Sequence, residues 1–207
     1  MNEVQSGQGG RKRHPIKLAL GGVILVGVAA VLYVIVAASF KPQGPVDLTE
    51  FKRGTLAKMD VPASPRPAPD TVFTSLDGKP ATLADFKGRV VVMNLWATWC
   101  APCRAEMPTL AKLQAVYATQ PVTVLPITVD RDGDLNLVNE EMAANPPLKT
   151  YRDPSYKLSF ALEPKAGGFP TTVIYDRQGR ERARMTGPAD WSSPEARGLV
   201  EKLLAEK

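Results

Sequence analysis

Two cysteines, Cys100 and Cys103, are the only ones in the chain, and they stand three positions apart in the run NLWATWCAPCRAEMP at residues 94–108. At this spacing on one helical turn the pair can exist as a dithiol or as a disulfide. A disulfide closing so short a loop constrains the unfolded chain very little, so it would be a weak structural staple. Two ordinary core cysteines or a stabilising bridge are the alternatives, but the pattern favours redox chemistry at the sulfur atoms.

The composition argues against metal and nucleic-acid chemistry. A structural zinc site needs four ligands, usually cysteine or histidine, and the only histidine is His14, far upstream. Of the net charge of +5, a share of +3 arises in the first seventeen residues, and no basic stripe with interleaved aromatic residues follows. We therefore expect no metal, no cofactor and no nucleic-acid partner.

The cysteines should lie where a buried strand gives way to a helix. Residues 89–97 (RVVVMNLWA) form an apolar, β-branched run of strand length, and 101–119 have apolar residues at helical spacing. Backbone N–H groups and the helix dipole at such a junction would lower the pKa of the Cys100 thiol, so Cys100 is the predicted nucleophile. Cys103 is the predicted resolving thiol, more buried on the same helix face, and Pro102 fits the first turn.

The remaining pattern predicts an α/β domain. Residues 121–130 read as a second buried strand, which completes a right-handed βαβ unit. Two extended pieces around a turn at Asp77-Gly78 precede it. Helices are expected at 135–144 and 155–162 with a short strand between them, then a hairpin at 171–187 with its turn at 176–179. An amphipathic helix capped by Ser192 or Ser193 should close the chain.

The N-terminal part reads as an anchor. Residues 18–40 contain no Asp, Glu, Lys, Arg or His, enough as a helix to cross a bilayer. Basic flanking residues favour a cytoplasmic tail at 1–17 and an external domain at 71–207. A cleaved signal peptide, with a small-residue site at Val36-Ala37-Ala38, is the alternative. Residues 41–70 are predicted to be a proline-rich tether, whose middle part could form a short helix or an added strand.

The motif NLWATWCAPC, followed by GGFPTTVI at 167–174, resembles the thioredoxin-like superfamily. Within it, these runs and GPADW at 187–191 are similar to the TlpA/ResA-like branch of membrane-anchored thiol-disulfide interchange proteins, and nearest to its TlpA-like members. The resemblance implies a thioredoxin-like fold, a mixed sheet of four or five strands with helices on both faces, preceded by one transmembrane helix. It also implies a substrate groove formed by Trp99, Pro102, Phe169 and a cis Pro170.

The resemblance further implies a place for proton transfer. Thioredoxin has a buried aspartate where this chain has Asn94, so that carboxylate is absent. A catalytic acid after the second strand is expected in ResA-like members, which makes Asp130 the candidate here. A solvent-facing acidic loop is the alternative interpretation of Asp130.

The resemblance also suggests the direction of electron flow. Strongly oxidising members carry a histidine between the cysteines, whereas this chain has Ala101-Pro102, which favours a reductant. The implied setting is the bacterial inner membrane with the domain in the periplasm. A thiol transporter of the CcdA or DsbD type would supply electrons, and apocytochrome c, a copper chaperone or a cytochrome oxidase subunit would be the substrate. A dithiol oxidase or isomerase and a copper-binding module are the competing functions.

Overall fold

The computed structural model describes residues 27–34 and 46–206. The chain divides into two units, Met1–Gly44 and Pro45–Lys207. In the first, residues 27–34 are helical. No helix in the part of the chain that the structure describes combines the length and apolarity needed to cross a membrane. The predicted tail at 1–17, and most of the predicted span at 18–40, lie outside the described residues.

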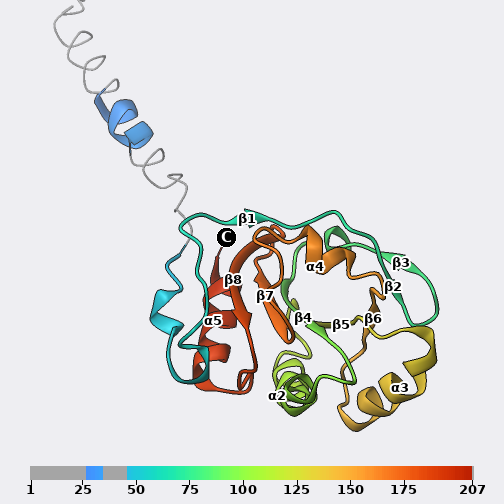
Figure 1. Ribbon diagram of the computed structural model, residues 1–207. Coiled ribbons are helices and arrows are strands. Elements are labelled where there is room, and N and C mark those ends of the chain that lie inside the picture. Colours follow the sequence, from blue (N-terminus) through green and yellow to red (C-terminus); the bar gives the residue numbers. More distant parts are fainter. Residues whose placement is uncertain (1–26, 35–45, 207) are drawn as a thin grey trace, which may run out of the picture. The chain divides into compact units, whose positions relative to one another are not determined.

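The second unit is built on a mixed sheet of eight strands in the order β1-β8-β7-β4-β5-β6-β2-β3. Figure 1 shows this sheet running from β8 through β4 and β5 to β2. Its four long central strands are β4 (Val90–Trp96), β5 (Val122–Thr128), β7 (Thr171–Tyr175) and β8 (Arg180–Thr186). The outer strands are β1 (Arg66–Pro67), β2 (Phe73–Ser75), β3 (Pro80–Ala81) and β6 (Tyr151–Arg152). The resemblance implied four or five strands; the eight strands include β2, β3 and β6, which lie where the sequence pattern placed short extended pieces, and the two-residue β1, which it did not predict.

Strand β4 lies at the centre of the sheet, between β7 and β5, and every one of its residues is buried. It pairs in parallel with β5, with Val92 opposite Val124, and antiparallel with β7, with Val92 opposite Ile174. Successive side chains point to opposite faces of the sheet. Val90, Val92 and Trp96 therefore belong to one core, and Val91, Met93 and Leu95 belong to the other.

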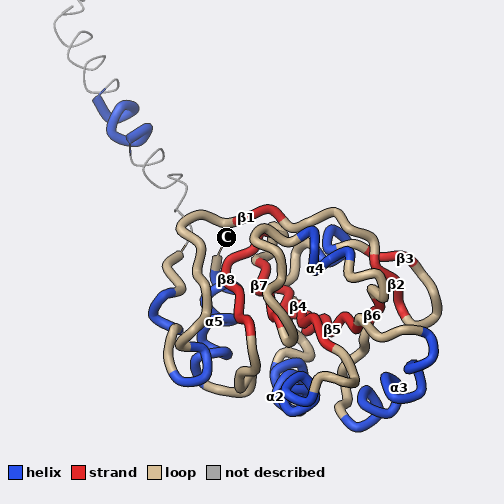
Figure 2. The backbone as a smooth tube through the Cα atoms, viewed as in Figure 1, coloured by secondary structure: helices blue, strands red, loops and turns tan. Residues whose placement is uncertain are grey.

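Helices cover both faces, as predicted. Helix α2 (Ala101–Val116), α3 (Leu135–Ala144) and α5 (Pro194–Ala205) contribute to the core that contains Trp96, and α4 (Lys157–Ala161) to the opposite core. Figure 2 shows α2 and α4 on opposite sides of the central strands. The Ser193 side chain caps α5 by accepting a hydrogen bond from the Ala196 N–H, at 3.2 Å. The sequence predicted this helix with a cap at Ser192 or Ser193, and Ser193 is the cap.

The predicted tether is wrong for the described residues from Val46 onward. Leu48, Leu56 and Met59 are fully buried in the core, so this segment belongs to the domain and the boundary at residue 71 is too late. The Val46 N–H donates to Glu206 Oε1 at 3.0 Å, and Arg182 donates to the Val46 carbonyl at 2.9 Å. The middle part, which the sequence left open, forms two 3₁₀ turns at Thr49–Phe51 and Gly54–Leu56.

Candidate active site

The two cysteines form a disulfide at the junction between β4 and α2. Their Cα atoms are 5.3 Å apart. Cys100 is the N-cap residue of α2, in extended backbone conformation, and the Cys103 N–H donates to its sulfur at 3.3 Å. Cys103 is fully buried and Cys100 is 6% exposed. Cys103 is therefore the more buried residue of the pair.

The helix start is the physical basis for the prediction that Cys100 is the reactive sulfur. The first turn of a helix has unpaired N–H groups and the positive end of the helix dipole, both of which stabilise a thiolate over a thiol. In the reduced protein the Cys103 N–H that faces this sulfur would donate to the thiolate. Pro102 lies in the first turn, where the missing N–H of proline costs no hydrogen bond.

An aromatic surface adjoins the disulfide. Trp99 is 62% exposed, which is unusual for so large an apolar side chain, and its ring lies edge-on to Phe169 with 5.9 Å between centroids. Tyr156 extends the cluster, 6.0 Å from the Phe169 ring. The peptide bond between Phe169 and Pro170 is cis, as the resemblance implied, and β7 begins immediately after it. These residues form an apolar platform suited to an extended polypeptide.

Asp130 is buried rather than part of a solvent-facing loop. Asp130 is only 1% exposed, and both oxygens of its carboxylate accept hydrogen bonds. Oδ1 accepts from the Thr98 hydroxyl at 2.9 Å, while Oδ2 accepts from the Thr98 N–H at 2.8 Å and from the Thr128 hydroxyl at 2.5 Å. Asp130 therefore fastens the loop before Cys100 to the end of β5.

A second buried carboxyl was not identified from the sequence. Glu106 lies one helical turn after Cys103 and is only 2% exposed. Its Oε1 accepts from Asn94 Nδ2 at 2.7 Å, and its Oε2 accepts from the Ala189 N–H at 3.0 Å and from Trp191 Nε1 at 3.2 Å. Burial raises the pKa of Glu106 to about 7, although the three hydrogen bonds oppose the rise. The available signal was an acidic residue on the apolar face of α2, between Cys103 and Leu110.

Comparisons with known proteins agree with this geometry. The family model described as Redoxin matches residues 63–200. The chain belongs to the Redoxin family. This Redoxin-family chain is 32% identical over 122 residues to thiol-disulfide oxidoreductase ResA of Geobacillus thermodenitrificans, covering 58% of this chain and 67% of the relative. It is 36% identical over 121 residues to thioredoxin-like protein YneN of Bacillus subtilis, covering 54% and 65% of the two chains.

A solved structure supports the same assignment. A putative thiol:disulfide interchange protein DsbE from Chlorobium tepidum aligns with a TM-score of 0.60 and 26% identity, covering 70% of this chain and 99% of that chain. The Redoxin-family chain is thus a TlpA/ResA-like member of the thioredoxin superfamily, as the sequence motifs indicated. Its activity is thiol-disulfide exchange.

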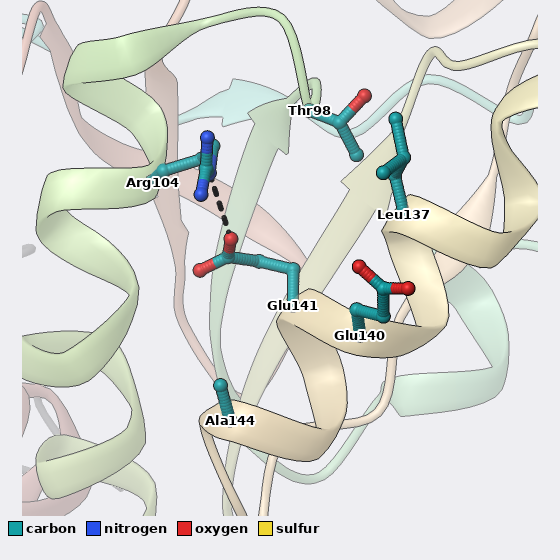
Figure 3. Close-up of a pocket in the computed structure, with 6 residues that line it drawn as sticks. All are labelled: Thr98, Arg104, Leu137, Glu140, Glu141 and Ala144. Carbon is teal, nitrogen blue, oxygen red and sulfur yellow. Dashed lines mark hydrogen bonds and ion pairs between the residues drawn. The ribbon is translucent and has the colours of Figure 1, made fainter.

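A recess lies beside the reactive loop of this Redoxin-family site, between α2 and α3. Its volume is about 210 Å³, and it is lined by Thr98, Arg104, Leu137, Glu140, Glu141 and Ala144. Figure 3 shows the Glu141 side chain turned toward Arg104, whose Nε donates to it at 2.9 Å. Two of its lining residues, Thr98 and Arg104, flank residues 99–103 in the sequence, and none of the lining residues belongs to the aromatic platform.

Proposed function

We propose that the protein is a membrane-anchored, extracytoplasmic reductant of cysteine pairs in partner proteins. The observation that carries this proposal is the asymmetric environment of the two sulfurs: Cys100 caps a helix beside an exposed aromatic platform, whereas Cys103 is fully buried behind it. A thiolate that the helix start stabilises can attack an incoming disulfide. A buried second sulfur can then resolve the intermediate without contacting the substrate.

The exchange proceeds in two balanced steps. The Cys100 thiolate attacks one sulfur of a substrate disulfide, which forms a mixed disulfide and releases the other substrate sulfur as a thiolate. The Cys103 thiolate then attacks Cys100, so that the Cys100–Cys103 bond forms and the second substrate sulfur leaves. Two electrons pass to the substrate. The protein ends in the disulfide form that the structure describes.

Glu106 fits the role of proton acceptor for the second step. Cys103 must lose its proton before it attacks, and its position away from solvent excludes bulk water as the base. Side chains three positions apart on a helix are neighbours. A carboxyl whose pKa is raised to about 7 can take a proton and release it near neutral pH, which is the property a general acid–base needs.

The reducing direction is supported by the residues between the cysteines. Ala101 and Pro102 add no charge that would stabilise the thiolate beyond the helix terminus, so the reduced form should be a good electron donor. A reductant outside the cytoplasm needs its own electron supply. A membrane thiol transporter of the CcdA or DsbD type is therefore the proposed donor.

The proposed setting rests on the apolar run at 18–40 and its basic N-terminal flank. It places the chain in the bacterial inner membrane with the domain in the periplasm. The proposed substrates are proteins whose cysteines must be reduced before haem or copper binds: an apocytochrome c, a copper chaperone or a cytochrome oxidase subunit. This choice rests on analogy with the TlpA/ResA-like branch.

A trapping experiment tests the proposal. In a Cys103→Ser variant of the full chain expressed in its native membrane, the mixed disulfide on Cys100 cannot be resolved, so substrates should remain covalently attached. Cys100→Ser/Cys103→Ser is the matched control and should trap none. The purified chain should have a reduction potential below about −200 mV, whereas a value above about −150 mV would indicate an oxidase. Failure to trap any protein would contradict the exchange mechanism.

A further inference from the structure

The segment Gly187–Trp191 contacts the candidate acid–base from the far end of the sequence. It lies between β8 and α5, more than eighty residues after Glu106, and supplies two of the three donors to that carboxyl. The Ala189 N–H and the Trp191 indole N–H both donate to Oε2. Ala189 is 7% exposed and Trp191 is 1% exposed, so water does not compete freely for these positions.

The segment is itself held in place from two sides. The Trp191 backbone N–H donates to the Thr109 hydroxyl at 3.1 Å, and Thr109 lies on the same helix as Glu106. The Asp190 N–H donates to the Thr55 hydroxyl at 3.0 Å, within the N-terminal segment. These contacts fix the two N–H groups relative to the carboxyl before any proton moves.

Asn94 completes the arrangement from the sheet. One amide hydrogen donates to Glu106 Oε1 at 2.7 Å and the other to the Thr172 hydroxyl at 2.9 Å. Its Oδ1 is buried and has no hydrogen-bond partner among the residues that the structure describes. An unpaired buried acceptor is costly. The amide adopts this orientation, despite that cost, because it directs an N–H donor at the carboxylate of Glu106.

Among residues 27–34 and 46–206, no charged side chain contributes to the pKa of Glu106. The elements packed around it offer Asn94 from β4, Thr172 from β7 through Asn94, and Ala189 and Trp191 from the segment after β8. Within α2, Arg104 is exposed and pairs with Glu141 at 2.9 Å, and Cys103 is held in the disulfide. Burial and the three N–H donors account for the pKa of Glu106, and no charged side chain adds to them. Each donor stabilises the ionised form, and burial stabilises the neutral form.

We propose that Gly187–Trp191 is a positioning element that sets the pH at which Glu106 exchanges its proton, acting through the Ala189 N–H and the indole N–H of Trp191. The proposal rests on the proposed role of Glu106 in resolving the mixed disulfide. Through this contact the C-terminal part of the domain controls how readily Cys103 is deprotonated. Trp191 itself touches neither sulfur nor substrate in this role.

The test is a Trp191→Phe variant of the full chain, which keeps an aromatic ring and removes the N–H donor. With ¹³C-labelled glutamate carboxyl groups, the NMR titration of Glu106, assigned by its loss in Glu106→Gln, should shift upward by about one pH unit, as expected for one lost donor to a charged acceptor. Trp96→Phe is the matched control, because the Trp96 indole is equally buried but donates to the Thr150 hydroxyl at 3.1 Å. That variant should leave the Glu106 midpoint unchanged.

An unchanged midpoint in Trp191→Phe, or an equal shift in Trp96→Phe, would overturn the inference. If Trp191→Phe does not fold, Ala189→Pro removes the other donor to Oε2 and should shift the midpoint in the same direction. The titration reads Glu106 directly and requires no substrate. Normal exchange by Glu106→Gln would instead refute the catalytic role of Glu106, while leaving the titration result intact.

Discussion

Replacing Glu106 by glutamine should remove a specific part of the pH dependence of stability. The carboxyl has a pKa of about 7 in the folded protein and 4.5 as its ordinary value. A raised pKa means that the folded state holds the proton more tightly than the unfolded chain does. The stability from this preference is fully present below pH 4.5 and is lost as the pH rises through about 7.

The size of the effect follows from the two pKa values. Each pKa unit is worth about 1.4 kcal/mol, so the complete loss is about 3 kcal/mol, most of which falls between about pH 5 and pH 8. Glutamine is neutral throughout and nearly identical in shape. At about pH 5 the free energy of unfolding of the variant should differ from that of the natural chain only by the loss of one or two hydrogen bonds, worth about 1 kcal/mol each.

The assay is urea unfolding of the purified, oxidised full chain, followed by tryptophan fluorescence at several pH values. The free energy of unfolding of Glu106→Gln relative to that of the natural chain should rise by about 2–3 kcal/mol between about pH 5 and pH 8. Other groups with raised pKa, such as Asp153, cancel in this difference. Glu140→Gln, at an exposed carboxyl, should run parallel to the natural chain. Parallel curves for Glu106→Gln would refute the assignment of a raised pKa to this group.

Two further substitutions test the elements around the site. Leu56→Ala should lower the free energy of unfolding by about 2–5 kcal/mol because the side chain is fully buried. Leu137→Ala is the control, since this residue is 52% exposed, and it should change the free energy of unfolding by less than about 0.5 kcal/mol. Equally small effects of the two substitutions would favour a tether at the segment that contains Leu56. Asp130→Asn should cost about 1–3 kcal/mol by weakening the hold on Thr98. The pH profile of exchange should keep its shape, since a changed profile would support the acid–base role predicted for Asp130.

The strand–helix junction was predictable because its signals are local. The buried strand, the cysteine at the helix start and the proline in the first turn all lie within twenty residues, and each follows from backbone geometry. The packed segment after Val46 was missed for the opposite reason. Its prolines indicate an extended chain, but the partners that hold it, Arg182 and Glu206, lie more than one hundred residues away.

The same distinction explains why Asp130 was named as a candidate and Glu106 was not. Asp130 follows the second buried strand, where the resemblance to ResA-like members implied an acidic residue. Glu106 sits within a helix, and only the fold shows that its three donors come from β4 and from the segment after β8. A pattern of side chains along one helix cannot show which distant N–H groups will meet a carboxyl on its buried face.

The two buried carboxyls divide the work of the site according to what surrounds them. Asp130 accepts from the loop that carries the reactive sulfur, so its hydrogen bonds determine where Cys100 lies. Glu106 accepts from Asn94, Ala189 and Trp191 and not from the loop that carries Cys100, so its hydrogen bonds affect its own pKa rather than the position of that loop. Removing the first carboxyl should therefore disturb geometry and stability, and removing the second should disturb the dependence on pH. That separation follows from the donors alone and holds for either direction of electron flow.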